Sequence, residues 1–329
     1  MILQITDLSV KIGGIEIVHI EDLSIGPGER VGLVGESGSG KTITAMSLIG
    51  LQPRDAILSG SILFGGREIL GLDDRSMSLI RSEEIGVIFQ DPSRALNPTM
   101  RIGKQMAEPF RVHTNLPRSA IQERVLGLLD RVQLSGGEDL LRRYPHQLSG
   151  GQQQRVVIAT AVALNPRLLI ADEPTTALDA SVQQGILTLL LELSKERDMS
   201  LLFVSHDLGV IRASSQRVAV MYGGRIVEVG PTDDLAGRPY HRYTQALLGA
   251  SPRLTDSKGQ LTARGERLSA IPGSVPPMGG FPDGCPFRGR CRYEISMCRE
   301  NPAITALENG HRHACWNPAT PGDARAASH

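Results

Sequence analysis

The sequence predicts an α/β fold in which a parallel sheet is covered by helices on both faces. Short, continuous apolar runs end in glycine or polar residues, and segments with apolar residues at helical spacing separate them. Runs of this kind are typical of parallel strands, because such strands are buried on both faces. An apolar content of 40% is sufficient for a packed core, which argues against wholesale disorder.

The predicted elements follow one another along the first 250 residues. An antiparallel β portion is expected near the N-terminus. Four apolar strands are predicted further on, at 29–35, 167–174, 200–207 and 216–224. Helical patterns begin at Lys41 (KTITAMSLIGL) and Val182 (VQQGILTLLLELSKE). Between about 91 and 155 the strand signal is absent and 118–132 has helical spacing, so a helical insert in the α/β core is predicted there.

The C-terminal part has a different composition. From about residue 251 the chain is rich in Pro, Gly and Ser, as in AIPGSVPPMGGFPDG, which predicts a loop-rich extension over 251–316. The last segment, 317–329, is predicted to be disordered. All four cysteines lie in the extension, so they form one local feature rather than a disulfide framework for the whole fold.

Charge and hydropathy exclude two classes of protein. The formal net charge is zero, whereas a general nucleic-acid-binding protein usually has a basic excess. No run approaches the roughly 18 apolar residues of a membrane span. The N-terminus lacks the basic and apolar regions of a signal peptide, so the chain is expected to be mature and cytosolic. Any work at a membrane would then go through partner subunits.

The stretch GESGSGKT predicts a phosphate-binding loop. It fits the pattern G-x-x-x-x-G-K-[ST] and lies between a predicted strand and a predicted helix. Glycines let backbone N–H groups surround a phosphate, and the helix N-terminus adds a favourable dipole. Lys41 is expected to neutralise β- and γ-phosphate charge, and Thr42 to bind Mg²⁺. The predicted nucleotide-binding residues of this loop are Gly35, Glu36, Ser37, Gly38, Ser39, Gly40, Lys41 and Thr42.

Two carboxylates end the predicted strand LLIADE. Asp172 is expected to hold Mg²⁺ through water, and Glu173 to polarise the attacking water as a general base. Alone, two acids at a strand end would more often be a solvated terminus or a helix cap. Their combination with the phosphate loop favours the catalytic interpretation.

Further motifs complete an ordered set. Gln90 follows the apolar run VIF, His206 follows the strand LLFVS, and a second glycine stretch, LSGGQ, begins at Leu148. An isolated SGG is as often a simple helix N-cap. Taken in order with GESGSGKT, LLIADEP and TALD (176–179), however, these motifs resemble the ATP-binding subunit of an ABC transporter over roughly residues 1–250.

This resemblance implies a P-loop NTPase (RecA-like) core and a second cassette packed head to tail. The glycine stretch would then contact the γ-phosphate of an ATP held by the partner. A hydroxyl and exposed N–H groups at the start of a helix suit this role, since they form an anion site. The signature residues are Leu148, Ser149, Gly150, Gly151 and Gln152.

The resemblance also implies roles for single residues. Gln90 would sense Mg²⁺ and the γ-phosphate, so that Thr42, Gln90 and Asp172 together form the Mg²⁺ site. His206 would contact the γ-phosphate and orient Glu173 as the second catalytic residue. Asp179 would bridge the dimer, and the stretch 89–105 would receive coupling helices of membrane subunits.

The adenine position departs from the family pattern. The family usually places an aromatic ring near the end of the first strand, and the equivalent residue is Ile12. Loss of that stack removes about 1 kcal/mol or somewhat more of adenine affinity. Weak discrimination between bases is therefore expected.

Two stretches narrow the resemblance to the peptide/nickel importer subfamily. FQDPSRALNP is similar to its FQDP-x-x-SLNP pattern, and IPGSVPPMGGFPDGCPFRGRC with the later cysteines is similar to its C-terminal extension. The resemblance implies a "D"-type ATPase subunit of a dipeptide or oligopeptide importer. Nickel, a metal–chelator complex or another small solute is the alternative cargo.

The four cysteines have the spacing C-x₅-C-x₆-C-x₁₆-C, whereas zinc modules favour shorter C-x₂₋₄-C pairs. Four thiolates also suit an iron–sulfur cluster, and the resemblance implies a [4Fe–4S] cluster ahead of Zn²⁺. Structural or free thiols are the further alternative. His311 and His313 are expected to be exposed loop residues rather than ligands. The candidate ligands are Cys285, Cys291, Cys298 and Cys315.

The implied partners are those of an importer. They are a second ATPase subunit, two transmembrane permease subunits and an extracytoplasmic substrate-binding protein, without nucleic acid. The second ATPase is expected to be a paralogue forming a heterodimer, although a homodimer stays open. The chain would lie at the cytoplasmic face of the membrane.

Other ATPase classes fit the sequence less well. Soluble ABC proteins of ribosomes usually carry two cassettes, whereas this chain has one phosphate loop. Those of chromosomes insert a long coiled coil, but only 57 residues separate Gln90 from Leu148. An unrelated P-loop kinase or GTPase would lack the LSGGQ stretch.

Overall fold

The computed structural model of the protein describes residues 1–176, 178–250, 270–307 and 309–320. The strands in this part of the chain are β1 (Leu3–Ile12), β2 (Ile15–Ile25), β3 (Arg30–Val34), β4 (Ile57–Phe64), β5 (Arg67–Glu68), β6 (Ile85–Ile88), β7 (Leu168–Asp172), β8 (Ser200–Ser205), β9 (Arg217–Tyr222), β10 (Arg225–Pro231), β11 (Thr305–Ala306) and β12 (Arg312–His313). The helices are α1 (Lys41–Ser47), α2 (Asp74–Ile80), α3 (Pro92–Ala95), α4 (Ile102–Met106), α5 (Glu108–His113), α6 (Arg118–Arg131), α7 (Gly137–Leu141), α8 (Gly150–Ala161), α9 (Ala180–Arg197), α10 (Leu208–Ser214), α11 (Thr232–Gly237) and α12 (Arg242–Ala250).

The strands form one hydrogen-bonded sheet that has a parallel part and an antiparallel part. Its order is β5-β4-β1-β2-β10-β9-β3-β8-β7-β6, and β12 adds to β10. β9, β3, β8, β7 and β6 pair in parallel, whereas β1, β2, β4 and β5 pair antiparallel. The predicted α/β fold with an N-terminal antiparallel portion is confirmed.

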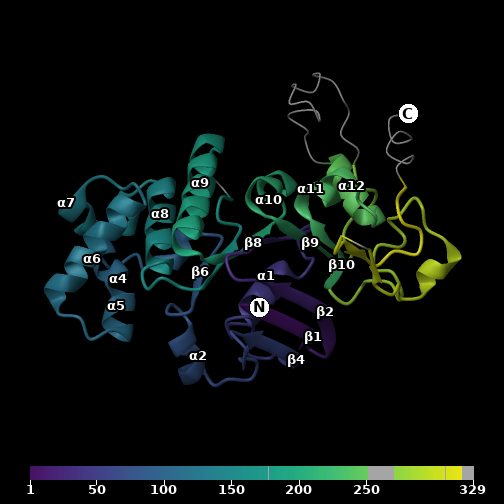
Figure 1. Cartoon of the computed structure of the whole chain (residues 1–329), viewed down its shortest axis with the longest axis horizontal. Coiled ribbons are helices and arrows are strands. Elements are labelled where there is room, and N and C mark those ends of the chain that lie inside the picture. Colours follow the sequence, from purple (N-terminus) through teal and green to yellow (C-terminus); the bar gives the residue numbers. More distant parts are fainter. Residues whose placement is uncertain (177, 251–269, 308, 321–329) are drawn as a thin grey trace.

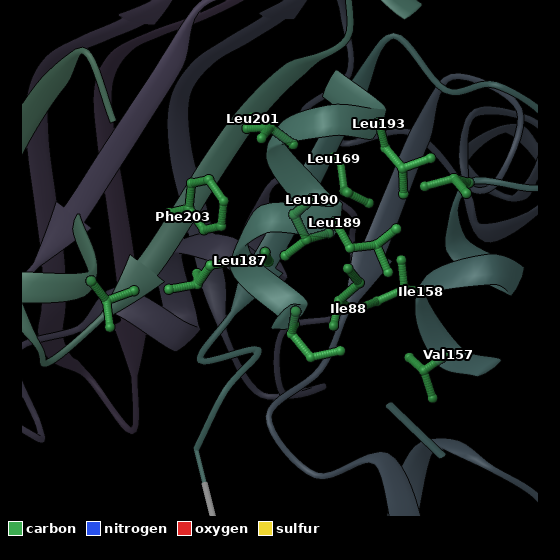
Figure 2. Close-up of a cluster of buried hydrophobic side chains, with 14 of the residues drawn as sticks. Ile88, Val157, Ile158, Leu169, Leu187, Leu189, Leu190, Leu193, Leu201 and Phe203 are labelled. Carbon is green, nitrogen blue, oxygen red and sulfur yellow. The ribbon is translucent and has the colours of Figure 1, made fainter. Parts of the chain in front are cut away.

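The parallel strands separate two hydrophobic cores. In β8, Leu201 and Phe203 enter the core that contains α8 and α9, while Leu202 and Val204 enter the core shared with β1, β2 and β4. Figure 2 shows Leu201 and Phe203 in one cluster with Leu190 of α9. Since both faces are covered, alternate residues are equally apolar, and the strands are therefore continuous apolar runs in the sequence.

The chain between β6 and β7 contains helices and no strand. α6 buries Ile121, Val125, Leu128 and Leu129, which recur at the spacing of one helix face. Figure 1 shows these helices, from α4 to α8, as a lobe at the left of the molecule, on the opposite side from the yellow C-terminal extension. None of the helices in the described part of the chain is both long and apolar enough to cross a membrane.

The extension is loop-rich, as predicted, but it is attached to the sheet. β12 pairs antiparallel with β10, where Glu228 lies opposite His313 and Val229 opposite Arg312. The expectation that His311 and His313 are exposed is wrong, because their exposed fractions are 1% and 5%. The imidazole Nε2 of His311 lies 2.7 Å from Oε1 of the buried Glu228. A carboxylate inside the protein needs a hydrogen-bonding partner of this kind, because an unpaired buried charge is costly.

The expected disorder of 317–329 is wrong for its first residues. The N–H of Ala319 donates to the carbonyl of Tyr240 at 2.8 Å, and Nε of Arg242 donates to the carbonyl of Asn317 at 2.8 Å. These bonds fix 317–320 against the start of α12. The remaining residues of the tail, 321–329, and the first part of the predicted extension, 251–269, lie outside the described residues.

Candidate active site

The candidate site lies where the parallel strands end. In the ladder, Val34 of β3 pairs with Ser205 of β8, while Asp172 of β7 pairs with Val204. The residues that follow these strands are the phosphate loop, His206 and Glu173, so they meet at one edge of the sheet. Gln90, two residues after β6, reaches the same edge. Ligand sites of open α/β sheets lie at this carboxyl edge.

The phosphate loop joins β3 to α1 in a conformation that depends on glycine. Gly40 has a φ of 103°, which residues with a side chain rarely adopt. A Cβ on Gly35 would lie 2.1 Å from the carbonyl oxygen of Met221. The loop therefore passes too close to β9 for any other residue at position 35.

Lys41 lies inside this loop and holds it together. Its ammonium Nζ donates to the carbonyls of Gly35 at 2.8 Å and Glu36 at 3.0 Å. Burial lowers the pKa of Lys41, while the carboxylates of Glu173, Asp172 and Glu36 oppose that shift. The lysine is thus a cation at the centre of the site, surrounded by acidic groups.

Thr42 and Asp172 provide neighbouring oxygen atoms. Oγ1 of Thr42 donates to Oδ1 of Asp172 at 3.4 Å. Burial raises the pKa of Asp172, and the charge of Glu173 raises it further, although Thr42 and Lys41 act in the opposite direction. A hydroxyl and a carboxylate beside a phosphate loop fit the few protein oxygens that Mg²⁺ takes together with water and substrate phosphate.

Glu173 accepts hydrogen bonds from three side chains. Its Oε2 accepts from Nε2 of Gln90 at 2.8 Å and from Oγ1 of Thr176 at 2.9 Å. Its Oε1 lies 2.8 Å from Nδ1 of His206. The residue has a φ of 48°, a left-handed conformation that is strained for a side chain of this type. The site therefore holds this carboxylate in one position.

The same contacts set the ionisation of Glu173. Burial acts to raise its pKa, but hydrogen bonds from His206 and Thr176 and the charges of His206 and Lys41 outweigh burial. The net effect is a lowered pKa. Glu173 is consequently ionised at neutral pH and able to accept a proton or a hydrogen bond from water.

The signature stretch forms the start of α8. Ser149 is the N-cap: its Oγ accepts from the N–H of Gln152 at 3.3 Å, and its own N–H donates to Oε1 of Gln152 at 3.0 Å. Ser149 and Gly150 are exposed, whereas Leu148 is buried. A Cβ on Gly151 would lie 2.8 Å from Cγ1 of Val182 in α9, so a bulkier residue there would displace that side chain.

The signature stretch is separate from the phosphate loop of the same chain. Figure 1 shows α8 in the helical lobe at the left, whereas α1 lies near the centre of the molecule. Asp179 is the N-cap of α9, and its Oδ1 accepts from the N–H of Val182 at 2.9 Å. Ile12 ends β1 and is only partly buried against the core that contains β1, β2 and β4.

Three contact residues were missed in the sequence. Thr176 bonds to Glu173, and it could have been found because it lies in the quoted stretch TALD. The other two, Tyr243 and Arg290, bond to Glu36 of the phosphate loop. They lie 207 and 254 positions away along the chain, and no local pattern predicts such contacts.

Two family models match the chain in separate regions. The model described as "ABC transporter" matches residues 18–176. The model described as "Oligopeptide/dipeptide transporter, C-terminal region" matches residues 227–298.

Curated relatives and solved structures agree with these matches. The chain is 44% identical to a putative peptide import ATP-binding protein of Brucella ovis, over 91% of both chains. It is 41% identical to the oligopeptide transport ATP-binding protein OppD of Salmonella typhimurium, over 97% of this chain and 94% of the relative. A dimeric ATP-binding cassette solved in a post-hydrolysis state with ADP and phosphate aligns with a TM-score of 0.62 and 30% identity, over 70% of this chain and 98% of the other.

Glu173→Gln is expected to reduce ATP hydrolysis by about 100- to 10,000-fold while ATP binding is retained, because the amide keeps hydrogen bonding but cannot accept the proton. Steady-state ATPase activity and direct measurement of the ATP Kd test this. Glu192→Gln, on an exposed position of α9, is the matched control. Activity of Glu173→Gln within tenfold of the wild-type value would contradict the role of general base.

The missing aromatic ring at position 12 predicts weak base selectivity. The kcat/KM for GTP is expected to lie within about fivefold of the value for ATP, and Ile12→Tyr should tighten ATP binding by about fivefold through stacking. Ile57→Tyr, at a position of β4 that is 69% exposed, controls for the added ring. A strong preference of the wild-type protein for ATP in competition would show that another group recognises adenine.

Proposed function

Because the chain belongs to the ATP-binding proteins of ABC transporters, in the oligopeptide/dipeptide branch, we propose that it uses the site at Lys41 and Glu173 to drive peptide import. It is the ATPase subunit of such an importer. The observation that carries the catalytic assignment is the meeting of the phosphate loop, Asp172 and Glu173 at the carboxyl edge of the sheet. The C-terminal match carries the assignment to peptide transport.

In the proposed mechanism the phosphate loop binds the triphosphate. The N–H groups at the start of α1 and the ammonium of Lys41 face its negative charge. Thr42 and Asp172 would hold Mg²⁺ with Gln90 close by, and the ion would neutralise charge that develops on the phosphate oxygens. Nucleotide binding would exchange the bonds of Lys41 to loop carbonyls for bonds to phosphate oxygens.

Hydrolysis then requires a positioned base. Ionised Glu173 accepts a proton from the attacking water, and Gln90, Thr176 and His206 hold its carboxylate in position. His206, whose side chain is 53% exposed, can reach a phosphate from the solvent side. The position of the base matters as well as its ionisation, because a misplaced carboxylate loses catalytic effect steeply.

We further propose that two cassettes complete each site. ABC cassettes dimerise, and the related dimeric cassette was solved with hydrolysis products bound. Exposed Ser149 and Gly150 begin α8 away from the phosphate loop of their own chain, which supports contact with an ATP on the partner. Asp179 lies nearby and would bridge the two cassettes. A paralogous partner is our proposal, and a homodimer is the alternative.

The surface for the membrane subunits is proposed to be a groove beside the helical lobe. This groove has a volume of about 420 Å³ and is lined by residues of the expected stretch 89–105, among them Phe89, Leu96 and Met100. Gln90 adjoins it and bonds to Glu173 at the same time. A helix inserted in the groove would thus be mechanically linked to the catalytic base. The subunit would lie at the cytoplasmic face of the membrane and bind two permease subunits.

The cysteines are proposed to hold an iron–sulfur cluster. The pKa of Cys285 is raised to about 11, chiefly by burial and in part by the neighbouring thiols of Cys315 and Cys298, so these groups lie within electrostatic range of one another. In the described residues, which include all four cysteines, no group of three or more His, Cys, Asp or Glu side chains is arranged to hold a metal ion. Zn²⁺ is the alternative to the cluster, and its ligands would all bond to one ion.

A four-iron cluster would take all four thiolates as its ligands. Its role would be structural or redox-sensing, and no step of ATP hydrolysis involves it. Protein purified without oxygen is expected to absorb near 400 nm and to contain about four iron and four sulfide per chain. Cys298→Ser should abolish both signals. Stoichiometric zinc, or a metal-free protein with the same stability, would contradict the cluster.

The cargo is tested with the complete transporter. ATPase activity of the reconstituted complex, with its extracytoplasmic binding protein, is expected to rise on addition of di- or oligopeptides and to disappear in Glu173→Gln. Stimulation by nickel complexes alone would leave the proposed ATPase mechanism unchanged but show that nickel, and not peptide, is the cargo. Activity that no membrane partner alters would contradict the transport function itself.

A further inference from the structure

The C-terminal extension contacts the phosphate loop through one arginine. Arg290 lies between Cys285 and Cys291, and its guanidinium forms two bonds to the carboxylate of Glu36, the second residue of the loop. Nη1 donates to Oε2 at 2.8 Å and Nη2 donates to Oε1 at 3.2 Å. The side chain of Arg290 is 8% exposed and that of Glu36 is 24% exposed, so water screens this ion pair little.

Arg290 is itself held in place by the core and the extension. Its Nε donates to the carbonyl of Pro272 at 2.8 Å, and its Nη1 also donates to Oη of Tyr222 at 3.0 Å. The guanidinium lies over the rings of Tyr222 and Phe287, 5.7 and 5.9 Å from their centroids. Burial acts to lower the pKa of Arg290, but its bonds to Glu36 and Tyr222 raise it overall. The guanidinium is therefore a fixed positive charge.

The backbone of Glu36 is held from the same direction. Its N–H donates to Oη of Tyr243 in α12 at 2.8 Å. Tyr243 and Tyr222 are fully buried, and their ring centroids lie 4.5 Å apart. Burial raises the pKa of Tyr243, which keeps its hydroxyl neutral. Both the side chain and the backbone of Glu36 are thus fixed by parts of the chain beyond residue 240.

This contact continues to the phosphate-binding lysine. The carbonyl of Glu36 accepts from Nζ of Lys41 at 3.0 Å, and the carbonyl of Gly35 accepts from the same atom at 2.8 Å. A shift of Glu36 would displace these carbonyls and the loop N–H groups that face the phosphates. If the contact between Arg290 and Glu36 served only to attach the extension, residues away from the phosphate loop would serve as well.

We propose that Arg290 is a positioning residue for the phosphate loop, through which the cysteine-bearing extension sets the affinity of the ATPase for nucleotide. The proposal rests on the proposed ATPase function and adds a control to the same site. Arg290 does not touch the reacting atoms in this scheme. It fixes Glu36, and Glu36 fixes the loop.

The test measures the ATP Kd directly, and KM and kcat in the reconstituted transporter, for Arg290→Ala, Arg290→Lys and Glu36→Gln. Arg290→Ala is expected to raise Kd and KM by about tenfold, the usual effect of losing a charge-assisted contact, with kcat within about threefold. Arg290→Lys should recover part of the affinity. Arg290→Ala combined with Glu36→Gln should bind no more weakly than Arg290→Ala alone.

Two controls separate positioning from simple stabilisation. Arg292→Ala changes an exposed arginine of the same loop and should leave Kd unchanged. Trp316, the single tryptophan of the chain, lies in the extension, where its Nε1 donates to the carbonyl of Glu300 at 3.0 Å. Its emission should be the same in the wild-type protein, Arg290→Lys and Glu36→Gln, which shows that the extension stays docked.

Unchanged Kd and KM in Arg290→Ala and Glu36→Gln would overturn the proposal, even if the melting temperature fell. A raised Kd in Glu36→Gln that adds fully to that of Arg290→Ala would also overturn it, because the two residues would then act independently. Absence of ATP binding by the wild-type protein would instead contradict the proposed function.

Discussion

The candidate active site depends on the register of the parallel strands. Because β3, β8 and β7 pair in step, Val34, Ser205 and Asp172 end their strands at the same edge. The next residues carry the candidate binding and catalytic groups, so their separation in space is set by backbone hydrogen bonds rather than by the side chains themselves. A slip of one residue would turn the side chains of a strand to the opposite core. Because packing in the two apolar cores fixes the register, it also fixes the geometry of the polar site.

Within this edge the charges stabilise one another. Lys41 is buried beside Asp172 and Glu173, and each of these groups would be costly to bury alone. Glu173 also has a strained backbone, and the surrounding hydrogen bonds hold it there. Strained backbone of this kind clusters at active sites, where the surrounding structure holds it in place.

The extension is a third part of the molecule rather than a loose appendage. Glu228 of β10 accepts from the N–H groups of Tyr240 and His241 and contacts His311, so one buried carboxylate joins the sheet, the start of α12 and the extension. The cysteine-bearing loop then reaches Glu36 through Arg290. The expected exposure of the histidines failed because a local stretch of loop sequence does not show which strand will pair with it.

The sequence alone determined the local chemistry. Continuous apolar runs identified strands with two covered faces, and GESGSGKT, LSGGQ and the carboxylates after LLIA identified the phosphate loop, a helix start and the candidate base. Each of these signals lies within a few residues, where spacing and backbone propensity act directly. Tertiary structure alone decided that Gln90 bonds to the carboxylate of Glu173 and that Tyr243 and Arg290 hold the phosphate loop. Such contacts join residues that are distant in sequence, and only the packing of complete strands and loops brings them within hydrogen-bonding distance.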